Sequence, residues 1–394
     1  MPILTTQSLP DIQAALRAAG LDGWLLYDFR ALNPIAQQVI GLPGPLSRRI
    51  FVLIPAEGVP RALTHNIEQG AWRDWPTGWG RDRYSAWVDL EAWLGRHLSG
   101  RRVAMEYSSG DAVPYLDRVP AGVLEMVQAA GATVVSSGEL VSRFYAVWTP
   151  EQLEAHKRAA VHVARIGQEA LRAAGDAVRR GESIHEHDVQ AWILAQFAAV
   201  GLETYAPPNV SVGAHAADPH YEPSAERPVR ITRGNVLLID LWAKEPDGIY
   251  ADQTWMAVLG PPTDRALEVW AAIRDARDAA IAFIADRVRR GEVVRGADAD
   301  DAARAVIVQR GYGQYFIHRT GHSIDAGAIH GSGPNLDNLE SRDVRTLQDG
   351  VGFSIEPGIY IPGDLGMRTE VNGYINGREL LITPSEIQRD LLVV

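Results

Sequence analysis

The stretch VLLIDLWAKEPDGIYADQTWMAVL, residues 236–259, decides the fold of the second half of this chain. Two apolar runs flank the turn sequence EPDG, and this pattern predicts a strand, a turn and a second strand. Asp240 ends the first apolar run, and Asp252 stands inside the second. A carboxylate buried alone costs several kcal/mol, so two of them on paired strands suggest a shared cation. Taken alone, the hairpin is equally compatible with two aspartates on the surface.

A second segment of the same kind makes the metal interpretation stronger. VGFSIEPGIYIPGDLGMRTEVNGYI, residues 351–375, again predicts strand, turn and strand. Glu356 follows an apolar stretch, and Glu370 lies on the return strand. Four hard oxygen donors brought together would repel one another without a metal ion.

The segment FIHRTGHSIDAGAIHGSGP, residues 316–334, adds nitrogen donors. It contains His318, His322 and His330, three of the eleven histidines of the chain, beside glycines that permit close approach. A single histidine usually has a structural role, but three at this density in a glycine-rich loop favour a site.

The order of the predicted elements indicates two domains. Helical and strand-like patterns alternate in residues 1–147 and predict an α/β layer, with helices at 8–20 and 87–97 and strands at 23–27, 49–55, 101–106 and 132–136. Thr149-Pro150-Glu151 is typical of a helix start. Residues 148–394 predict an α+β domain, with helices at 150–178, 183–200, 264–290 and 297–310 and strands at 235–242, 249–259, 351–361, 367–376 and 378–383.

The ordered set Asp, Asp, His, Glu, Glu on these local strings resembles the pita-bread metallopeptidases, the family of methionine aminopeptidase, aminopeptidase P and prolidase (Xaa-Pro dipeptidase). The resemblance covers about 150–394, and residues 1–147 are more weakly similar to the N-terminal domain of the creatinase and prolidase branch. It implies a pita-bread catalytic domain and five metal ligands: Asp240, Asp252, His322, Glu356 and Glu370.

The resemblance also implies roles for residues beside the metal ions. His220, in the string DPHYEP, and His330 match substrate-side histidines, and both would donate hydrogen bonds to the scissile carbonyl. His318 matches the first histidine of the HxxGH string and is implied to bind substrate. Arg368 matches an arginine that holds the hydrogen-bond network or the substrate carboxylate. Glu356 is implied to accept and return a proton during hydrolysis.

Several positions depart from the family pattern without removing a ligand. The steps from Asp240 to Asp252 and from His322 to His330 are each one residue longer than usual. Ser323 replaces the usual glycine after the metal histidine, and Gly331-Ser332-Gly333 follows His330 in place of Glu-x-Pro. Trp255 replaces the arginine that often follows the second aspartate. These departures leave open the pose of His330 and the shape of the substrate site.

Composition excludes several other classes of protein. The chain has no cysteine, which excludes a disulfide scaffold, a thiolate zinc site, an iron–sulfur cluster and a cysteine nucleophile. Acidic residues outnumber basic ones by 49 to 38, for a net charge of -11, which disfavours nucleic acid as a partner. The sequence shows neither a signal-peptide pattern nor a run of about 20 apolar residues. We therefore expect a cytoplasmic protein that does not bind membranes.

These inferences predict a metal-dependent exopeptidase of the prolidase branch that cleaves Xaa-Pro dipeptides, with a small peptide carrying proline second as its substrate. Aminopeptidase P, which takes longer Xaa-Pro peptides, and a non-catalytic binding protein on the same fold remain alternatives. Four carboxylates and one histidine are hard ligands, so two divalent ions are expected, Mn²⁺ first and Co²⁺, Fe²⁺ or Zn²⁺ as alternatives. Related two-domain enzymes suggest a homodimer.

Two further clusters receive narrower predictions. The loop AWRDWPTGWG, residues 71–80, contains Trp72, Trp75 and Trp79, and we weigh a lid over the substrate against packing inside the N-terminal domain or a dimer contact. His185 and His187 have a spacing that can suit a metal, but they stand at a helix start among acidic residues, which favours a solvated helix face.

Overall fold

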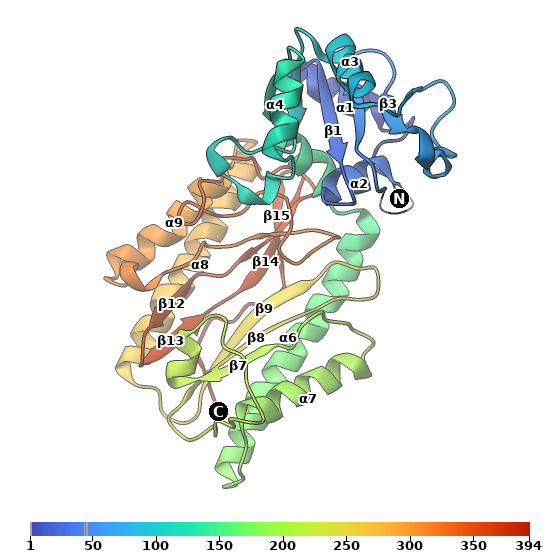
Figure 1. Cartoon of the computed structure of the whole chain (residues 1–394). Coiled ribbons are helices and arrows are strands. Elements are labelled where there is room, and N and C mark those ends of the chain that lie inside the picture. Colours follow the sequence, from blue (N-terminus) through green and yellow to red (C-terminus); the bar gives the residue numbers. More distant parts are fainter. Residues whose placement is uncertain (1, 43, 45) are drawn as a thin grey trace. The chain divides into compact units, whose positions relative to one another are not determined.

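The computed structural model describes residues 2–42, 44 and 46–394. It divides into two compact units, Met1–Tyr145 and Ala146–Val394, which we call the N-terminal unit and the C-terminal unit. Figure 1 shows the elements of each unit. Within the described residues, no helix combines the length and the apolar character needed to cross a membrane.

The N-terminal unit is a mixed six-stranded sheet with helices on both faces. The strand order is β4-β3-β2-β1-β5-β6. Its strands are β1 (Gly23–Asp28), β2 (Ile50–Pro55), β3 (Arg61–His65), β4 (Gly80–Tyr84), β5 (Arg102–Met105) and β6 (Thr133–Ser136). Its helices are α1 (Leu9–Ala18), α2 (Pro34–Ile40), α3 (Trp87–Leu98), α4 (Ala121–Ala129) and the single turn α5 (Gly138–Leu140).

Alternation along β1 explains why both faces of this sheet are covered. Trp24 and Leu26 pack on the side of α1 and α2, whereas Leu25 and Tyr27 pack on the side of α3 and α4. Successive side chains of a strand point to opposite faces of the sheet. A strand whose residues are apolar in an unbroken run, without alternating polar residues, is therefore buried on both faces. All six residues of β1 are buried.

The C-terminal unit contains long helices and three small sheets. Its helices are α6 (Pro150–Arg179), α7 (Glu186–Ala199), α8 (Asp264–Arg290) and α9 (Gly296–Gln309). Its strands are β7 (Asn209–Val212), β8 (Val236–Ala243), β9 (Ala251–Val258), β10 (Ser323–Ile324), β11 (Gly352–Ile355), β12 (Gly358–Ile361), β13 (Leu365–Arg368), β14 (Val371–Asn376), β15 (Glu379–Thr383) and β16 (Leu392–Val393). The sheets have the orders β16-β9-β8-β7, β10-β11-β14-β15 and β12-β13.

The ends of the long helices follow local chemistry. The Thr149 side chain accepts from the Gln152 amide at the start of α6, and the Gln152 side chain accepts from the Thr149 amide in return. The Thr263 side chain accepts from the Ala266 amide at the start of α8, and Gly291 ends this helix with φ 71°, a left-handed conformation that glycine adopts without strain. The predicted start at residue 150 and the predicted helix 264–290 are confirmed.

The hairpin β8–β9 lies between two apolar cores. Leu237, Ile239 and Trp255 face the core that α6 and α7 cover, whereas Leu238 and Met256 face the core built on α8. Figure 1 shows the strands of the C-terminal unit between the α6–α7 pair and the α8–α9 pair. The face that carries Leu238 and Met256 thus points toward the core that also contains Ile355 of β11 and Val371 of β14.

The segment 351–375 differs from the single hairpin that the sequence predicts. β11 pairs with β14, with Ile355 opposite Val371, and β12 pairs with β13, with Gly358 opposite Arg368. Residues 356–357 and 369–370 lie between the two pairings and belong to no strand. The predicted long strands are therefore interrupted where their two glutamates stand.

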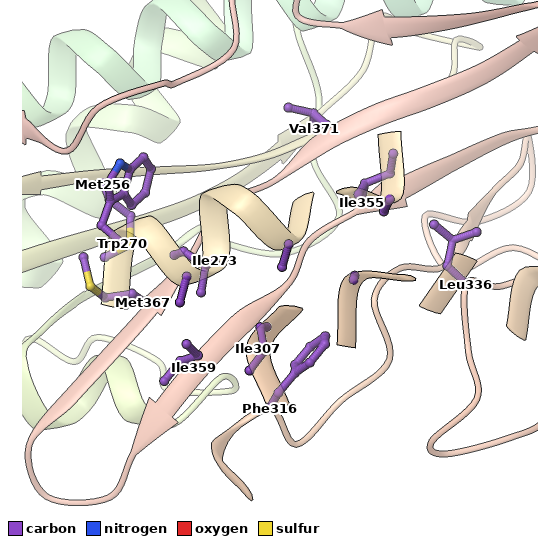
Figure 2. Packing of buried hydrophobic residues seen from close by; sticks show 14 of the residues in the cluster. Met256, Trp270, Ile273, Ile307, Phe316, Leu336, Ile355, Ile359, Met367 and Val371 are labelled. Carbon is purple, nitrogen blue, oxygen red and sulfur yellow. The ribbon is translucent and has the colours of Figure 1, made fainter. Parts of the chain in front are cut away.

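The apolar core of this region fixes the position of the interruption. Figure 2 shows Ile355, Ile359, Met367 and Val371 from these strands in the same cluster as residues of α8 and α9. Each of the four is at most 2% exposed, and burial of such a side chain is worth about 1.5–3 kcal/mol. A shift of register by one residue would turn these side chains away from the core.

Candidate metal centre

The four predicted carboxylates lie together in the C-terminal unit, two of them on strands β8 and β9 and two at the breaks between the strands of segment 351–375. Asp240 on β8 stands opposite Thr254, and Asp252 on β9 stands opposite Trp242. This register puts both aspartates on one face of the hairpin, two residues apart along the ladder. Asp240 and Glu356 are 9% exposed, and Asp252 and Glu370 are 4% exposed. We call Asp240, Asp252, Glu356 and Glu370 the acid centre.

At the acid centre, hydrogen bonds from backbone and side-chain groups join strand β9 to β14 and to Glu370, the residue just before β14. The Asp252 amide donates to the Asn372 side chain over 3.0 Å, and the Asn372 side chain donates back to the Asp252 carbonyl oxygen over 2.8 Å. The Thr254 hydroxyl donates to Glu370 over 2.8 Å. Neither Thr254 nor Asn372 was identified by sequence reasoning, although each stands two residues from a predicted ligand.

His322 reaches the acid centre from the loop before β10. Its Nε2 lies 3.4 Å from Asp252 and 3.3 Å from Glu356. Its amide donates to the Ser354 hydroxyl, which in turn donates to Glu356 over 3.0 Å. Gly321 is required here, because an added Cβ would stand 2.0 Å from the Ser354 carbonyl oxygen. Ligand atoms of Asp252, His322 and Glu370 lie within 4.8 Å of one another.

Arg368 is the basic side chain of the acid centre. It forms an ion pair with Asp240, and its Nε donates to Thr254 over 2.8 Å. The same Nε lies 3.9 Å from Glu356 and 3.9 Å from Glu370. Arg368 is 6% exposed, so its position fits the network role that the resemblance implies.

The four acids of the acid centre repel one another, and Arg368 alone does not neutralise them. Burial raises the pKa of Asp240 to about 6, and repulsion by Asp252 adds to this effect. Burial followed by repulsion from Glu356 raises the pKa of Asp252 to about 8. Burial and the other acids also raise the pKa of Glu370 well above its usual range. Like charges held close together in a buried place produce such shifts.

Glu356 behaves differently from the other three acids. Burial acts to raise its pKa, but the charges of His322 and Arg368 outweigh burial and lower the pKa to about 2. Glu356 is therefore ionised over the whole physiological range. A carboxylate in that state is able to accept a proton from a nucleophile.

The residues of the acid centre fit divalent metal ions. The donor set is hard, with four carboxylates and one imidazole. Glu370 Oε1 is buried without a hydrogen-bond partner in the described part of the chain, so it is an acceptor that a cation would satisfy. The structure therefore brings together Asp240, Asp252, His322, Glu356 and Glu370, as the resemblance implies, and their role as ligands stays a prediction.

His330 lies beside His322. The rings of His322 and His330 meet edge to face, with centroids 4.2 Å apart. Chiefly the charge of His322 lowers the pKa of His330 to about 3, so its imidazole is neutral near pH 7. The loop between His322 and His330 is held by Asp325, whose carboxylate accepts from the amides of Gly327, Ala328 and Ser332.

His318 and His220 lie at different depths. His318 Nε2 bonds the Tyr360 hydroxyl at 2.9 Å, and its Nδ1 lies 2.6 Å from the Arg319 carbonyl oxygen. Both ring nitrogens are thus engaged by the fold. His220 is exposed on the loop after β7, and its charge contributes to the lowered pKa of His330, so the two lie near one another.

The loop that carries His220 is anchored by a buried glutamate that the sequence did not suggest. Glu186, which is 1% exposed at the start of α7, accepts from the Tyr221 hydroxyl over 2.6 Å and from the Val212 amide over 2.8 Å. His215 stacks on Tyr221 with ring centroids 4.3 Å apart. The adjacent His185 and His187 rings stack on each other and share Asp188, whose carboxylate also accepts from the His185 amide.

Trp255 and the tryptophans of the loop 71–80 each pack against an apolar core of their own unit. Trp255 points to the opposite face of β9, where it packs against Gly167 of α6. Trp72 is 2% exposed, and Trp75 and Trp79 pack against the same core of the N-terminal unit. The three indoles meet edge to face at 5.3 and 5.1 Å. This arrangement favours packing for these tryptophans, and a lid role stays a prediction.

Comparison with known proteins agrees with the fold. A crystal structure of dipeptidase PepE from Mycobacterium ulcerans superposes with a TM-score of 0.72 at 24% identity, covering 98% of this chain and 96% of that one. A relative from Mycobacterium tuberculosis named "Probable dipeptidase PepE" is 29% identical over 364 residues, 91% of this chain and 88% of the relative. The Xaa-Pro dipeptidase of Lactobacillus delbrueckii subsp. lactis is 37% identical over 166 residues, 42% of this chain and 41% of the relative.

The fold and the acid centre define a metallopeptidase with a pita-bread catalytic unit and an α/β N-terminal unit. The model of metallopeptidase family M24 matches residues 158–376, more than half of the chain. The chain belongs to this family, and it is therefore a hydrolase that depends on divalent metal ions. The predicted family, fold class and enzyme class are confirmed.

Proposed function

We propose that this protein is a dinuclear metal-dependent exopeptidase that hydrolyses Xaa-Pro bonds, most simply as an Xaa-Pro dipeptidase. The observation that carries the proposal is the acid centre, where four buried carboxylates lie together, His322 approaches Asp252 and Glu356, and Arg368 pairs with Asp240. The Xaa-Pro dipeptidase and PepE relatives support the choice of substrate class. A small peptide with proline at its second position is the proposed substrate.

The five proposed ligands are Asp240, Asp252, His322, Glu356 and Glu370. Bound divalent ions, with Mn²⁺ proposed first, supply Lewis acidity that makes water a nucleophile near neutral pH. Two ions suit the charge of the site, because four carboxylates carry more negative charge than Arg368 offsets.

The residues of the chain then have distinct tasks in hydrolysis. Glu356, ionised because of its low pKa, accepts the proton of the attacking water and delivers it to the leaving nitrogen. His330 is neutral, so a ring N–H is available to donate to the scissile carbonyl as it gains negative charge. His220 is proposed to donate from the opposite loop. Arg368 holds Asp240 and Thr254 in place, and His318 orients Tyr360.

An assay of matched peptides tests the proposal. Metal-loaded protein should cleave Xaa-Pro dipeptides and show little action on the corresponding Xaa-Pro-Yaa tripeptides. Equal kcat/KM for both would favour aminopeptidase P, and binding without cleavage of either would favour a non-catalytic protein. A homodimer and a cytoplasmic location remain predictions, which sedimentation and cell fractionation can check.

A further inference from the structure

The N-terminal unit has a cavity at one edge of its sheet that the proposed function does not use. Its volume is about 470 Å³, within the range of about 300–1,000 Å³ that is usual for small-molecule sites. Strands β1, β3 and β4 run in the same direction, and the cavity lies at their carboxyl ends, where open α/β sheets bind ligands. We call it the edge pocket. Its lining includes Tyr27, Arg48, Arg49, His65, Tyr84 and Trp87.

The register of the strands puts four of these side chains on one face of the sheet. Tyr27 stands opposite Phe51, and His65 stands opposite Tyr84. Tyr27, Phe51 and Tyr84 pack in the core on the α3 side of the sheet. Arg49 precedes Phe51 by two residues, and side chains two residues apart share a face. The edge pocket is therefore built by the sheet itself on the side that α3 covers.

Two phenol hydroxyls lie within reach of Arg49. Burial raises the pKa of Tyr27 and of Tyr84, and the charge of Arg49 acts in the opposite direction on both, so its guanidinium lies near both hydroxyls. The Tyr84 hydroxyl donates to the Arg49 carbonyl oxygen over 2.8 Å. Tyr27 is only 4% exposed, yet its hydroxyl has no hydrogen-bond partner among the residues that the structure describes. It is a buried donor that a ligand would satisfy.

The two arginines bring positive charge to the edge pocket without a carboxylate partner. Within the described residues, neither guanidinium forms an ion pair, and Arg48 donates to the Ser47 hydroxyl over 2.9 Å. The neighbouring carboxylate of Glu68 instead accepts from the Ser47 hydroxyl and from the amides of Ser47 and Arg48. Guanidinium groups bind carboxylate and phosphate through paired hydrogen bonds. Two of them beside an unpartnered hydroxyl favour an oxyanion, although the whole chain carries a net charge of -11.

The remaining lining adds a further donor and a flat apolar surface. His65 Nδ1 accepts from the Ile67 amide over 3.3 Å, so the neutral ring carries its proton on Nε2. The rings of His65 and Tyr84 meet edge to face, with centroids 4.9 Å apart. Trp87, the first residue of α3, is 64% exposed. Aromatic side chains of this kind contact the ring of a ligand through a large apolar area.

We propose that the edge pocket binds a small molecule in which an oxyanion, phosphate or carboxylate, is attached to an aromatic ring. Arg48 and Arg49 hold the oxyanion, the Tyr27 hydroxyl donates to it, and Trp87 contacts the ring. The residues of the edge pocket all belong to the N-terminal unit, whereas the acid centre belongs to the C-terminal unit. This inference therefore stands apart from the proposed function.

Calorimetric titration of the full-length, metal-loaded protein tests the proposal. The probes are phenyl phosphate, 3-phenylpropanoate, the uncharged 3-phenylpropanol and inorganic phosphate, which lacks the ring. Binding at the edge pocket is the component that Arg49→Gln weakens, since an anion bound to metal ions in the acid centre does not depend on Arg49. For that component, we expect one of the two ring-bearing anions to bind at least about 10-fold more tightly than 3-phenylpropanol or inorganic phosphate. The tighter of the two identifies phosphate or carboxylate as the preferred oxyanion.

Four variants separate the groups of the edge pocket. Arg49→Gln should raise the Kd of the bound anion by about 10-fold or more, because it removes a charged hydrogen-bond donor. Tyr27→Phe keeps the buried ring and removes only the hydroxyl, so Kd should rise by about 2–10-fold. Trp87→Ala should weaken the ring-bearing anion severalfold and leave inorganic phosphate unchanged. Arg96→Gln, at an exposed position of α3, is the matched control and should leave every Kd unchanged.

Thermal unfolding of each variant shows whether its fold is intact before the affinities are compared. Equal Kd values for wild type, Arg49→Gln and Tyr27→Phe would overturn the edge pocket as an oxyanion site. Inorganic phosphate bound there as tightly as phenyl phosphate, with no effect of Trp87→Ala, would overturn the aromatic part of the proposal. Ring-bearing anions that bind Glu356→Gln protein as they bind wild type would support a site that is independent of hydrolysis.

Discussion

The acid centre and the pair His220 and His330 serve the same proposed reaction but are held by different kinds of backbone. The carboxylates stand on or beside paired strands, and their flanking residues Ile355 and Val371 are at most 2% exposed. His220 and His330 stand on loops, are exposed, and are positioned by the single buried acids Glu186 and Asp325. Packing in the apolar core therefore fixes the carboxylates of the acid centre. The two histidines that are proposed to bind the scissile carbonyl depend instead on a few hydrogen bonds within their loops.

The largest effect should follow from a change inside the acid centre. Glu356→Gln keeps the shape of the side chain but removes the proton acceptor, and kcat should fall by about 10²–10⁴-fold. Steady-state kinetics on an Xaa-Pro dipeptide, with metal content measured in parallel, provides the readout. Glu169→Gln, on the exposed face of α6, is the matched control. A kcat within twofold of wild type would remove Glu356 from the reaction.

A smaller loss should follow on the loop side. His330→Ala removes one donor to the carbonyl oxygen, so kcat should fall by about 10²-fold while metal content stays at the wild-type level. His187→Ala, in the stacked pair at the start of α7, is the control. If His330→Ala lost metal instead, His330 would belong to the metal centre and the division between the two regions would fail.

The acid centre should also make the metal-free protein sensitive to alkaline pH. The pKa of Asp252 is about 8 in the folded chain and lower when unfolded, so folding takes up a proton between about pH 4 and 8. Stability from this group is full below the unfolded pKa and is lost as pH rises through the folded pKa. In chelator-treated protein, Asp252→Asn should therefore become more stable relative to wild type as pH rises from 5 to about 8.

Urea unfolding of wild type and Asp252→Asn at several pH values measures this difference directly. The comparison of two chains at each pH cancels the contribution of His156, whose pKa burial lowers to about 4 and which destabilises the fold in acid. A difference in free energy of unfolding that did not change with pH would mean that the carboxyls do not repel one another.

The smallest effect concerns the departures around His322. Ser323 occupies a position where the family usually has glycine, and a Cβ on Gly333 would stand 2.4 Å from the Ser323 hydroxyl oxygen. Gly333→Ala should therefore destabilise the protein by about 1–3 kcal/mol. Ser323→Gly in the same chain removes the hydroxyl and should recover part of that loss. The recovery should be incomplete, because the new Cβ would still stand 2.8 Å from the Cβ of Ala146. Additive effects of the two changes in thermal unfolding would contradict this steric coupling.

Sequence reasoning located His322 through the density of histidines in segment 316–334 and the family resemblance, and it located the four proposed carboxylate ligands because they stand beside or inside apolar strand patterns. The same signal located both long helices, 150–178 and 264–290, whose ends carry ordinary caps. The apolar pattern did not reveal that the strands of segment 351–375 are interrupted, because apolar residues continue on both sides of Glu356 and Glu370. It also missed Glu186, Asp325 and Thr254, which have no motif and gain importance from partners distant in the sequence.

Metal content and activity, measured on the same sample, test the central claim most directly. Protein purified in Mn²⁺ should carry two divalent ions per chain and cleave an Xaa-Pro dipeptide. Exhaustive chelation should remove the ions and the activity together, and added Mn²⁺ or Co²⁺ should restore both in wild type but not in Asp252→Asn. Full hydrolysis by protein shown to be free of metal would contradict the assignment of the acid centre.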